Sequence, residues 1–392
     1  MKKILIIIMA VIAISPLFAQ NNISEVLSAV EQNNTTLKAL RETANSNKLG
    51  NKTGIFLSAP EIGFNYLWGN PSSIGSRKDI NIKQSFDIAT ISGMKNRLAD
   101  QQNDRVEWQY QADRMNILLE AKQYLLDLIY YNGLLKELMI RKSHAESIAS
   151  SQKKRLDKGE GNVLEYNNVR LNLSKIEAEI QRIETERNAT ASQLTRLNGG
   201  VIVSVENDDF ESLSLPTDFN SWYSVAESKN PVLAYVKSDI ELNKKQLSLN
   251  KAMNLPSFSI GYMSEKTMGQ RYQGVSVGVS IPLWSNKNKV KQAKAAVVAA
   301  EARRADATTQ FYNQLEILYQ RAAGLQEAAK TYRRSLLDAN NSQLLKKALD
   351  AGEISVLDYM IQAGLYYDSV DKALAAERDY QKAFAELSAV EL

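Results

Sequence analysis

One short sequence occurs twice in the chain, and this duplication is the strongest constraint on the fold. RLDKGEGNVLEY (Arg155–Tyr166) matches ALDAGEISVLDY (Ala348–Tyr359) at an offset of 193 residues. Upstream, APEIGFNYLWG (Ala59–Gly69) matches LPSFSIGYMSE (Leu255–Glu265) at an offset of 196, and DINIKQSFDI (79–88) matches GVSVGVSIPL at an offset of 195. Collinear matches at a nearly constant offset indicate two copies of one structural unit.

Both copies predict the same order of elements. A short helix comes first, two strands follow, and a very long helix leads through a Gly turn into a shorter helix. The hairpin helices are predicted over residues 93–197 and 286–390. Each long helix of roughly 65 residues would form a rod of about 100 Å at ~1.5 Å per residue. A rod of that length is suited to crossing a distance rather than to filling a compact core.

The repeats define the predicted organisation of the chain: a first repeat over 20–198, a linker over 199–219 and a second repeat over 220–392. Residues 1–19 have a basic start, an apolar run and a final Ala suited to cleavage, which predicts a secretory signal peptide. An N-terminal anchor helix is the alternative. No later segment approaches ~20 continuous apolar residues, so any membrane insertion would have to use β-strands.

Four segments alternate as strands do, at about 59–68, 79–88, 255–264 and 274–284. GVSVGVSIPLW (Gly274–Trp284) is the clearest, with apolar residues on one parity and Gly or Ser on the other. Thirteen residues form the predicted apolar, lipid-facing side of these strands: Ile62, Phe64, Tyr66, Trp68, Ile80, Ile82, Phe258, Ile260, Tyr262, Val275, Val277, Val279 and Ile281.

The strands leave two interpretations open. A small soluble sheet could pack its apolar face onto the helices. Alternatively, each strand has about the length that a tilted strand needs to span a bilayer, and aromatic residues at the strand ends suit the membrane interface. Four strands are too few to close a barrel, whereas three copies of the chain would supply about twelve. The membrane interpretation therefore predicts an obligate oligomer with a wide aqueous bore.

Composition excludes several classes of function. The chain has no Cys and one His, His144, so thiolate sites, His-rich metal sites and a nucleophile–His pair are not predicted. A formal net charge of +4 does not suggest nucleic-acid binding. We expect no enzyme activity, no cofactor and no metal site, and we expect His144 to be an ordinary solvated residue.

The whole mature chain resembles the TolC family of outer-membrane efflux proteins. Three features carry the resemblance: strand entries at Pro60 and Pro256, the SIPLW strand exit (Ser280–Trp284), and the paired LDKGEGNVLEY and LDAGEISVLDY turns. The resemblance implies a mostly α protein with a membrane β-barrel. The expected homotrimer would have a 12-stranded barrel in the outer membrane of a Gram-negative-type envelope, above a periplasmic α-helical tunnel. The 199–219 linker would lie near the tunnel equator.

By this resemblance the chain is a passive exit duct that works with a periplasmic adaptor protein and an inner-membrane pump. The Gly turns would be the periplasmic tips that dock on the adaptor, although their leucines could instead pack within the turn itself. The predicted docking residues are Leu156, Gly159, Gly161 and Leu164 in the first repeat, and Leu349, Gly352, Val356 and Leu357 in the second.

The resemblance also implies a tunnel constriction formed by acidic rings near the tips. Asp358 stands at the expected position and Glu165 is its repeat partner, with an ordinary solvated carboxylate as the alternative for each. Three copies of a carboxylate around one axis would favour cations. The chain has Glu353 and Ile361 where the family's closing contacts would place a base and a second acid, so the sequence does not predict how the tip is held closed.

The sequence leaves the cargo open. Efflux of drugs, metals or other cations through an RND-type pump is one expectation, and export of a protein by type I secretion is another. A periplasmic coiled-coil scaffold without membrane insertion is a third.

Overall fold

The structure is a computed structural model that describes residues 23–338 and 342–392. The predicted signal peptide lies outside the described residues. The chain divides into two compact units. Unit 1 combines the described residues up to Asn34 with Glu120–Leu213 and Leu325–Lys382, whereas unit 2 combines Thr35–Leu119, Ser214–Gly324 and Ala383–Leu392. Each unit therefore takes segments from both sequence repeats.

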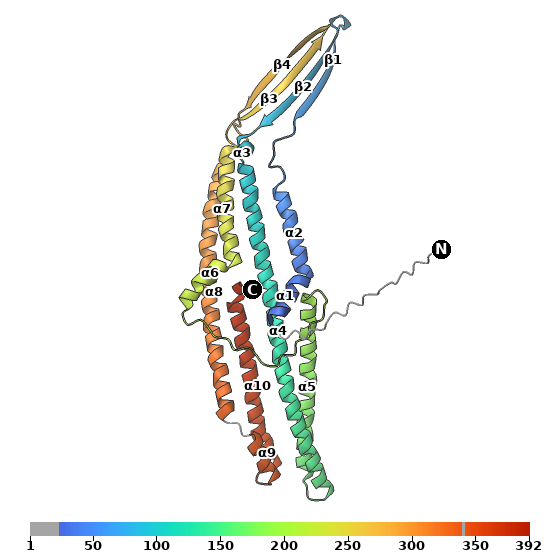
Figure 1. The fold of residues 1–392 in the computed structure, drawn as a ribbon, viewed down its shortest axis with the longest axis vertical. Helices are drawn as coiled ribbons and strands as arrows, with labels where there is room; N and C mark the ends of the chain where they lie inside the picture. Colours follow the sequence, from blue (N-terminus) through green and yellow to red (C-terminus); the bar gives the residue numbers. More distant parts are fainter. Residues whose placement is uncertain (1–22, 339–341) are drawn as a thin grey trace, which may run out of the picture. The chain divides into compact units, whose positions relative to one another are not determined.

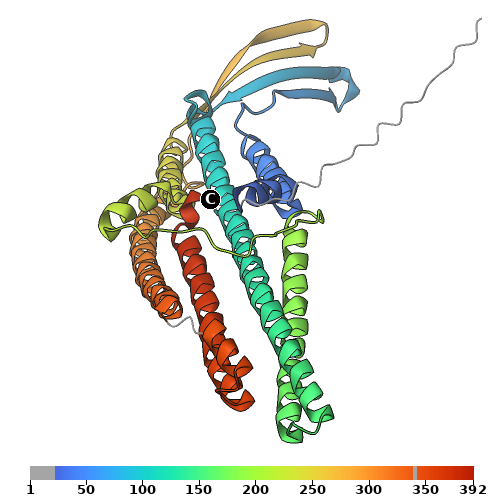
Figure 2. The ribbon, with the colours of Figure 1, turned by 60° about the horizontal axis from the view of Figure 1, so that its bottom comes forward.

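Unit 2 contains one antiparallel sheet of four strands in the order β1-β2-β3-β4 (Figures 1 and 2). The strands are β1 (Glu61–Trp68), β2 (Ser76–Phe86), β3 (Ser257–Thr267) and β4 (Gln270–Ser280). The first and second repeats each supply one hairpin, and β2 pairs with β3 to join the hairpins, for example with Ile82 opposite Tyr262. All four predicted strands are confirmed, with boundaries shifted by a few residues.

Unit 2 contains two small apolar cores. Its helices are α2 (Thr35–Asn51), α3 (Ile88–Ile91), α6 (Phe219–Lys229), α7 (Pro231–Ala252), the N-terminal parts of α4 (Met94–Asp157) and α8 (Lys289–Asp338), and the end of α10 (Val356–Leu387). One core gathers Ala89, Leu98, Leu249 and Ala252. The other centres on Tyr223, Leu315 and Leu387, beside a Phe219–Tyr312 aromatic pair whose ring centroids are 5.6 Å apart.

Unit 1 is built on the C-terminal part of α4, with α5 (Val163–Leu197) running alongside it (Figure 1). The unit also contains α1 (Ile23–Asn33), α9 (Ser342–Asp350) and most of α10 (Val356–Leu387). Leu134 and Leu138 on α4 pack against Ile180 and Ile183 on α5. The spacing of four residues on α4 and three on α5 places each pair on one face of its helix.

Side chains of unit 1 donate hydrogen bonds to the backbone of the linker between the repeats. The Asn132 amide donates to the carbonyl oxygens of Val205 and Asn207, and the Gln381 amide donates to that of Glu211 at 2.6 Å. The linker backbone lies very close to α4 at Gly133. A Cβ added to Gly133 would lie 2.7 Å from the Asp208 carbonyl oxygen. Hydrogen bonds to side chains thus replace the backbone ladder that the extended linker lacks.

Three predicted helices differ in detail from the structure. Each short helix that opens a repeat is two helices, because a buried asparagine separates them: Asn34, 2% exposed, and its repeat partner Asn230, 4% exposed. Asn230 caps α7 by accepting a hydrogen bond from the Leu233 amide, and Pro231 follows at the first helical position.

The second long helix, predicted over 286–351, is described as α8 and α9, with residues 339–341 between them outside the described residues. Its start at Lys289 follows Asn288, which has a positive φ of 66° and so cannot belong to a helix. Within residues 23–338 and 342–392, no helix is both long and apolar enough to cross a membrane.

Candidate functional site

The most unusual surface of the described chain is one face of the sheet. All thirteen residues predicted to form its apolar side are exposed, up to 81% for Trp68 and 78% for Val275. Cross-strand pairing brings them into rows, because directly opposed residues share a face. One row runs from Ile62 through Ile82 and Tyr262 to Val275. The alternative of a sheet packed by this face onto the helices is therefore not what the structure contains.

The opposite face of the sheet is mainly polar, with Leu67, Met263 and Tyr272 as its exposed apolar or aromatic members. Asn81 lies opposite Gly63 and Met263, and Lys83 lies opposite Gly261. An added Cβ at Gly63 would meet the Asn81 side chain at 2.6 Å, so the glycine makes room for the larger polar group next to it. Ser259, Ser276 and Ser280 continue this face on β3 and β4. A sheet with one apolar and one polar face can separate a nonpolar from an aqueous medium.

Charged groups gather near the hairpin-loop end of the sheet. The Arg77 guanidinium lies 2.8 Å from the Asp79 carboxylate and 3.2 Å from that of Glu265. The Lys78 ammonium lies 5.5 Å from the centre of the Tyr66 ring. The Arg77–Glu265 pair connects β2 to β3, whereas the Arg77–Asp79 pair lies within β2.

The two Gly turns of unit 1 have the same backbone hydrogen bonds at the repeat offset. The Gly159 amide donates to the Leu156 carbonyl oxygen, and the Gly352 amide donates to the Leu349 carbonyl oxygen. The amides of the following glutamates, Glu160 and Glu353, donate to Arg155 and Ala348. Both glycines have φ of 74°, a conformation that favours glycine and ends the helix. The next helices are capped at equivalent positions by Asn162 and Ser355.

The turns expose some of the predicted docking residues and bury others. Leu164 is 70% exposed and Leu357 52% exposed, and both lie in the first turn of a helix. Leu156 and Leu349 are half-buried. A Cβ added to Gly161 would lie only 2.7 Å from the Leu156 amide nitrogen. Val356 is only 4% exposed, so its side chain packs within unit 1 rather than facing outwards.

The two predicted constriction carboxylates lie in different surroundings. Asp358 is exposed and accepts a 2.6 Å hydrogen bond from the Ser355 hydroxyl, which in turn accepts from the Asp358 amide. This reciprocal pair stabilises the start of α10. Glu165 is half-buried and lines a cavity of about 660 Å³ that also contains Glu353, Arg155 and His144. Ile361, 56% exposed, lies one turn beyond Asp358.

A charge pair between a buried arginine and a partly exposed aspartate, which the sequence did not predict, connects α4 to α10. The guanidinium of Arg141, a buried residue, donates to both carboxylate oxygens of Asp371, at 2.9 and 2.6 Å. It also lies 4.7 Å from the centre of the Tyr367 ring. Burial raises the pKa of the Tyr367 hydroxyl to about 12, so this group stays protonated.

His144 belongs to the same cluster rather than to the solvent. Its Nδ1 lies 3.2 Å from the Tyr367 hydroxyl, and the residue is half-buried. The expectation of an ordinary solvated histidine is therefore wrong, because α10, distant in sequence, covers this part of α4.

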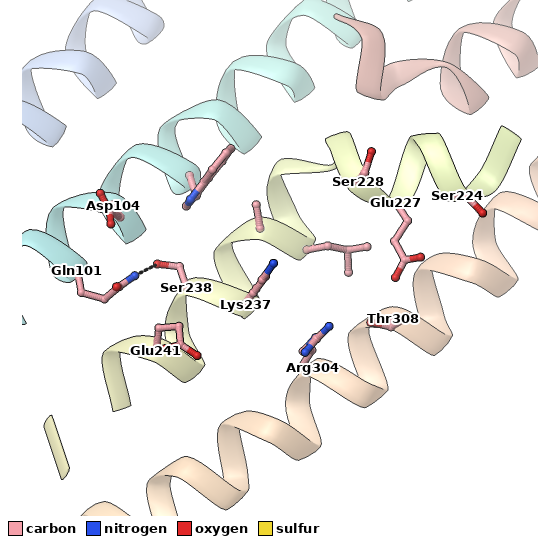
Figure 3. Close-up of a pocket in the computed structure, with 13 residues that line it drawn as sticks. Gln101, Asp104, Ser224, Glu227, Ser228, Lys237, Ser238, Glu241, Arg304 and Thr308 are labelled. Carbon is pink, nitrogen blue, oxygen red and sulfur yellow. Dashed lines mark hydrogen bonds between the residues drawn. The ribbon is translucent and has the colours of Figure 1, made fainter. Parts of the chain in front are cut away.

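Figure 3 shows a cleft of about 510 Å³ in unit 2 that sequence reasoning also missed. Asp104, Glu227 and Glu241 contribute acidic groups, whereas Lys237 and Arg304 contribute basic ones. The mixture of signs offers no concentrated charge for an ion. Among the residues that the structure describes, no group of three or more His, Cys, Asp or Glu side chains could hold a metal ion.

Sequence comparison finds similarity to an efflux protein family and to a secretion protein. The family model "outer membrane efflux protein" matches residues 222–390. The alkaline protease secretion protein AprF of Pseudomonas aeruginosa is 24% identical over 230 residues, which is 54% of this chain and 48% of AprF. The match therefore spans about half the length of this curated relative.

Structural comparison finds the same architecture over nearly the whole chain. A membrane protein from Pseudomonas aeruginosa superposes with a TM-score of 0.76 at 14% identity, covering 94% of this chain and 89% of the other. The CmeC outer membrane channel of Campylobacter jejuni superposes with a TM-score of 0.70 at 14% identity, covering 94% and 85%. The resemblance stated from the sequence is confirmed, and the fold is that of these channels.

Proposed function

The chain belongs, through residues 222–390, to the outer membrane efflux protein family, and from that premise we propose that it is the outer-membrane exit duct of an export system. Three copies would close a barrel of about twelve strands in the outer membrane. The helices of the three copies would enclose a tunnel in the periplasm. The duct provides the path, while an inner-membrane pump provides the energy.

One observation supports this proposal most strongly: the apolar face of the sheet is exposed, and the opposite face is mainly polar. A contiguous surface that includes Trp68, Phe64, Ile260 and Val277 is unfavourable in water and marks a contact with lipid or with another protein. In lipid the same face is favourable, provided that every strand edge finds a hydrogen-bond partner.

The turns support docking of a periplasmic adaptor. Leu164 and Leu357 stand exposed at equivalent positions of the two repeats, so a trimer would present six similar apolar sites. An adaptor that recognises one turn could recognise the other, because their backbone hydrogen bonds coincide. The neighbouring Asp358 would form a ring of three carboxylates where the tunnel narrows, with Glu165 behind it on the other hairpin.

The native mass of the protein extracted by detergent from the outer-membrane fraction tests the proposal. We expect a species near three times the protomer mass of 43.8 kDa, less the signal peptides. A monomer recovered from the soluble periplasm would contradict the membrane duct and favour the scaffold.

Two classes of cargo have support from different observations. The family description favours efflux. We propose drugs, metals or other cations, delivered by an RND-type pump, as the candidate cargo. The similarity to a protease secretion protein favours export of a protein in one step. Deleting the gene separates them: increased sensitivity to toxic compounds or metal salts would indicate efflux, whereas loss of one protein from the culture medium would indicate secretion.

A further inference from the structure

The apolar face of the sheet carries a row of three cations near the hairpin loops. Strand pairing places Lys78 of β2 opposite Lys266 of β3, and Lys266 opposite Arg271 of β4. The row continues to Tyr66 on β1, which lies opposite Lys78. Directly opposed residues share a face, so the cations lie on the same apolar face as Tyr66. All three cationic residues are exposed.

The cation row lies at the end of the sheet that is farther from the helices of unit 2 (Figure 1). Lys266 is the last residue but one of β3, and Arg271 is the second residue of β4. Towards the helices, the same face presents Ile82, Tyr262 and Val275 as directly opposed residues. The face is therefore apolar near the helices and cationic near the hairpin loops.

The polar face shows how this sheet neutralises like charges on adjacent strands. Asp79 of β2 lies directly opposite Glu265 of β3, an arrangement that by itself is unfavourable. The Arg77 guanidinium lies 2.8 Å from the Asp79 carboxylate and 3.2 Å from that of Glu265. One cation within the sheet thus compensates the two opposed carboxylates.

The apolar face has no carboxylate to compensate its cations. The acidic residues within the four strands, Glu61 included, all lie on the polar face. The contacts that the cations make within the described chain are to uncharged groups. The Arg271 Nε donates to the Ser264 hydroxyl oxygen at 3.2 Å, and the Lys78 ammonium lies 5.5 Å from the centre of the Tyr66 ring. An anion from outside the chain would supply the missing charge.

We propose that Lys78, Lys266 and Arg271 bind the phosphate groups of a phosphorylated glycolipid of the lipid A class. The inference rests on the proposed duct, in which the apolar face meets lipid, and it names the lipid that this face selects. With the helices in the periplasm, the hairpin loops face outwards, so the row lies among the headgroups of the outer leaflet. The acyl chains of the same lipid would pack on the apolar rows below.

The spacing of the row suits a headgroup with more than one phosphate. Neighbouring strands are ~4.8 Å apart, so the backbone positions from β2 to β4 span about 10 Å. Flexible lysines on two strands and the fork of an arginine on the third supply charge-assisted hydrogen bonds over that distance. A single phosphate of an ordinary phospholipid would engage only part of the row. Contact with lipid strengthens these interactions, because the surroundings have a low dielectric constant.

Binding of purified lipid A to the delipidated trimer in detergent tests the inference, with bound lipid counted by native mass spectrometry. The test variant, K78Q/K266Q/R271Q, removes the three charges. A second variant, K78R/K266R/R271K, keeps them. The matched control, K287Q/K291Q/K294Q, removes the same charge from exposed positions beyond the other end of β4. Lipid A without its phosphates and phosphatidylglycerol are the comparison lipids.

We expect the test variant to bind lipid A at least about tenfold more weakly than the unmodified protein, because it loses charge-assisted contacts. The charge-preserving variant and the matched control should bind like the unmodified protein. Removing the phosphates from lipid A should weaken its binding to the unmodified protein to a similar extent, a result that does not depend on how the test variant folds.

Equal binding of lipid A by the test variant and the unmodified protein would overturn the site. Equally tight binding of phosphatidylglycerol by the unmodified protein would overturn the assignment to a glycolipid with several phosphates. Either result in an intact trimer would leave the duct standing. Absence of a native trimer in the unmodified protein would instead refute the proposed function and, with it, this inference.

Discussion

Asp358 combines a structural bond and a charge, and substitution can separate the two. Asp358→Asn removes the charge but keeps an oxygen that accepts from the Ser355 hydroxyl, whereas Asp358→Ala loses both. If Asp358 lines the constriction, both variants weaken cation preference in planar-bilayer recordings. Only the Ala variant should also lose stability, by about 1 kcal/mol, because it breaks the cap. Unchanged ion selectivity in Asp358→Asn would count against the ring.

Glu107 on α4 is the clearest pH-dependent group in the helices of unit 2. Burial by itself raises the pKa of its carboxyl, but hydrogen bonds from Lys48, Gln111 and Arg41 outweigh it and lower the pKa to about 2. Because the folded-state pKa lies below the usual 4.5, the stabilisation is complete above about pH 4.5 and is lost as the pH falls towards 2.

Comparison of the protein with Glu107→Gln measures this contribution. At pH 7 we expect the variant to have a free energy of unfolding lower by about 1–2 kcal/mol, allowing for the partial exposure of the carboxylate. The difference should shrink towards zero as the pH approaches 2. Chemical denaturation of detergent-solubilised protein across that pH range measures the difference. A difference in the free energy of unfolding that stays constant with pH would show that the charge of the Glu107 carboxylate does not stabilise the fold.

At the scale of elements, the Gly turns are fixed by local bonds, which is why the sequence predicted them well. The hydrogen bonds from Gly159 and Gly352 span three residues, and the caps at Asn162 and Ser355 act within one turn. The Arg141–Asp371 pair joins residues 230 positions apart, so nothing local indicated it. The burial of Val356 has the same origin, since it depends on how α10 packs in unit 1.

The exposed leucines of the turns give a prediction about docking. Leu164→Asp and Leu357→Asp together should abolish transport while the native mass stays unchanged, because a buried carboxylate at an apolar contact is strongly unfavourable. Leu49→Asp, on the exposed face of α2, is the matched control, and it should transport normally. Full transport by the turn variant would exclude these leucines from the adaptor contact.

At the scale of the whole molecule, the sequence predicted the repeat, the four strands and the apolar face, because each rests on periodicity or direct repetition. It did not predict the compact units. Repeat boundaries follow the duplication of the chain, whereas compact units follow packing, and here packing mixes the two copies. The burial of Asn34 and Asn230 was not predicted either, because a polar residue within a helical pattern is expected to be exposed.

The mixing of repeats in each compact unit has a consequence for how the exported chain folds. Neither unit can be completed until segments of the second repeat have arrived. Until then, Ala89 and Leu98 of the first repeat lack the Leu249 and Ala252 side chains that later cover them, and exposed apolar surface of this kind favours aggregation. Folding of this chain is thus one long event rather than two short ones.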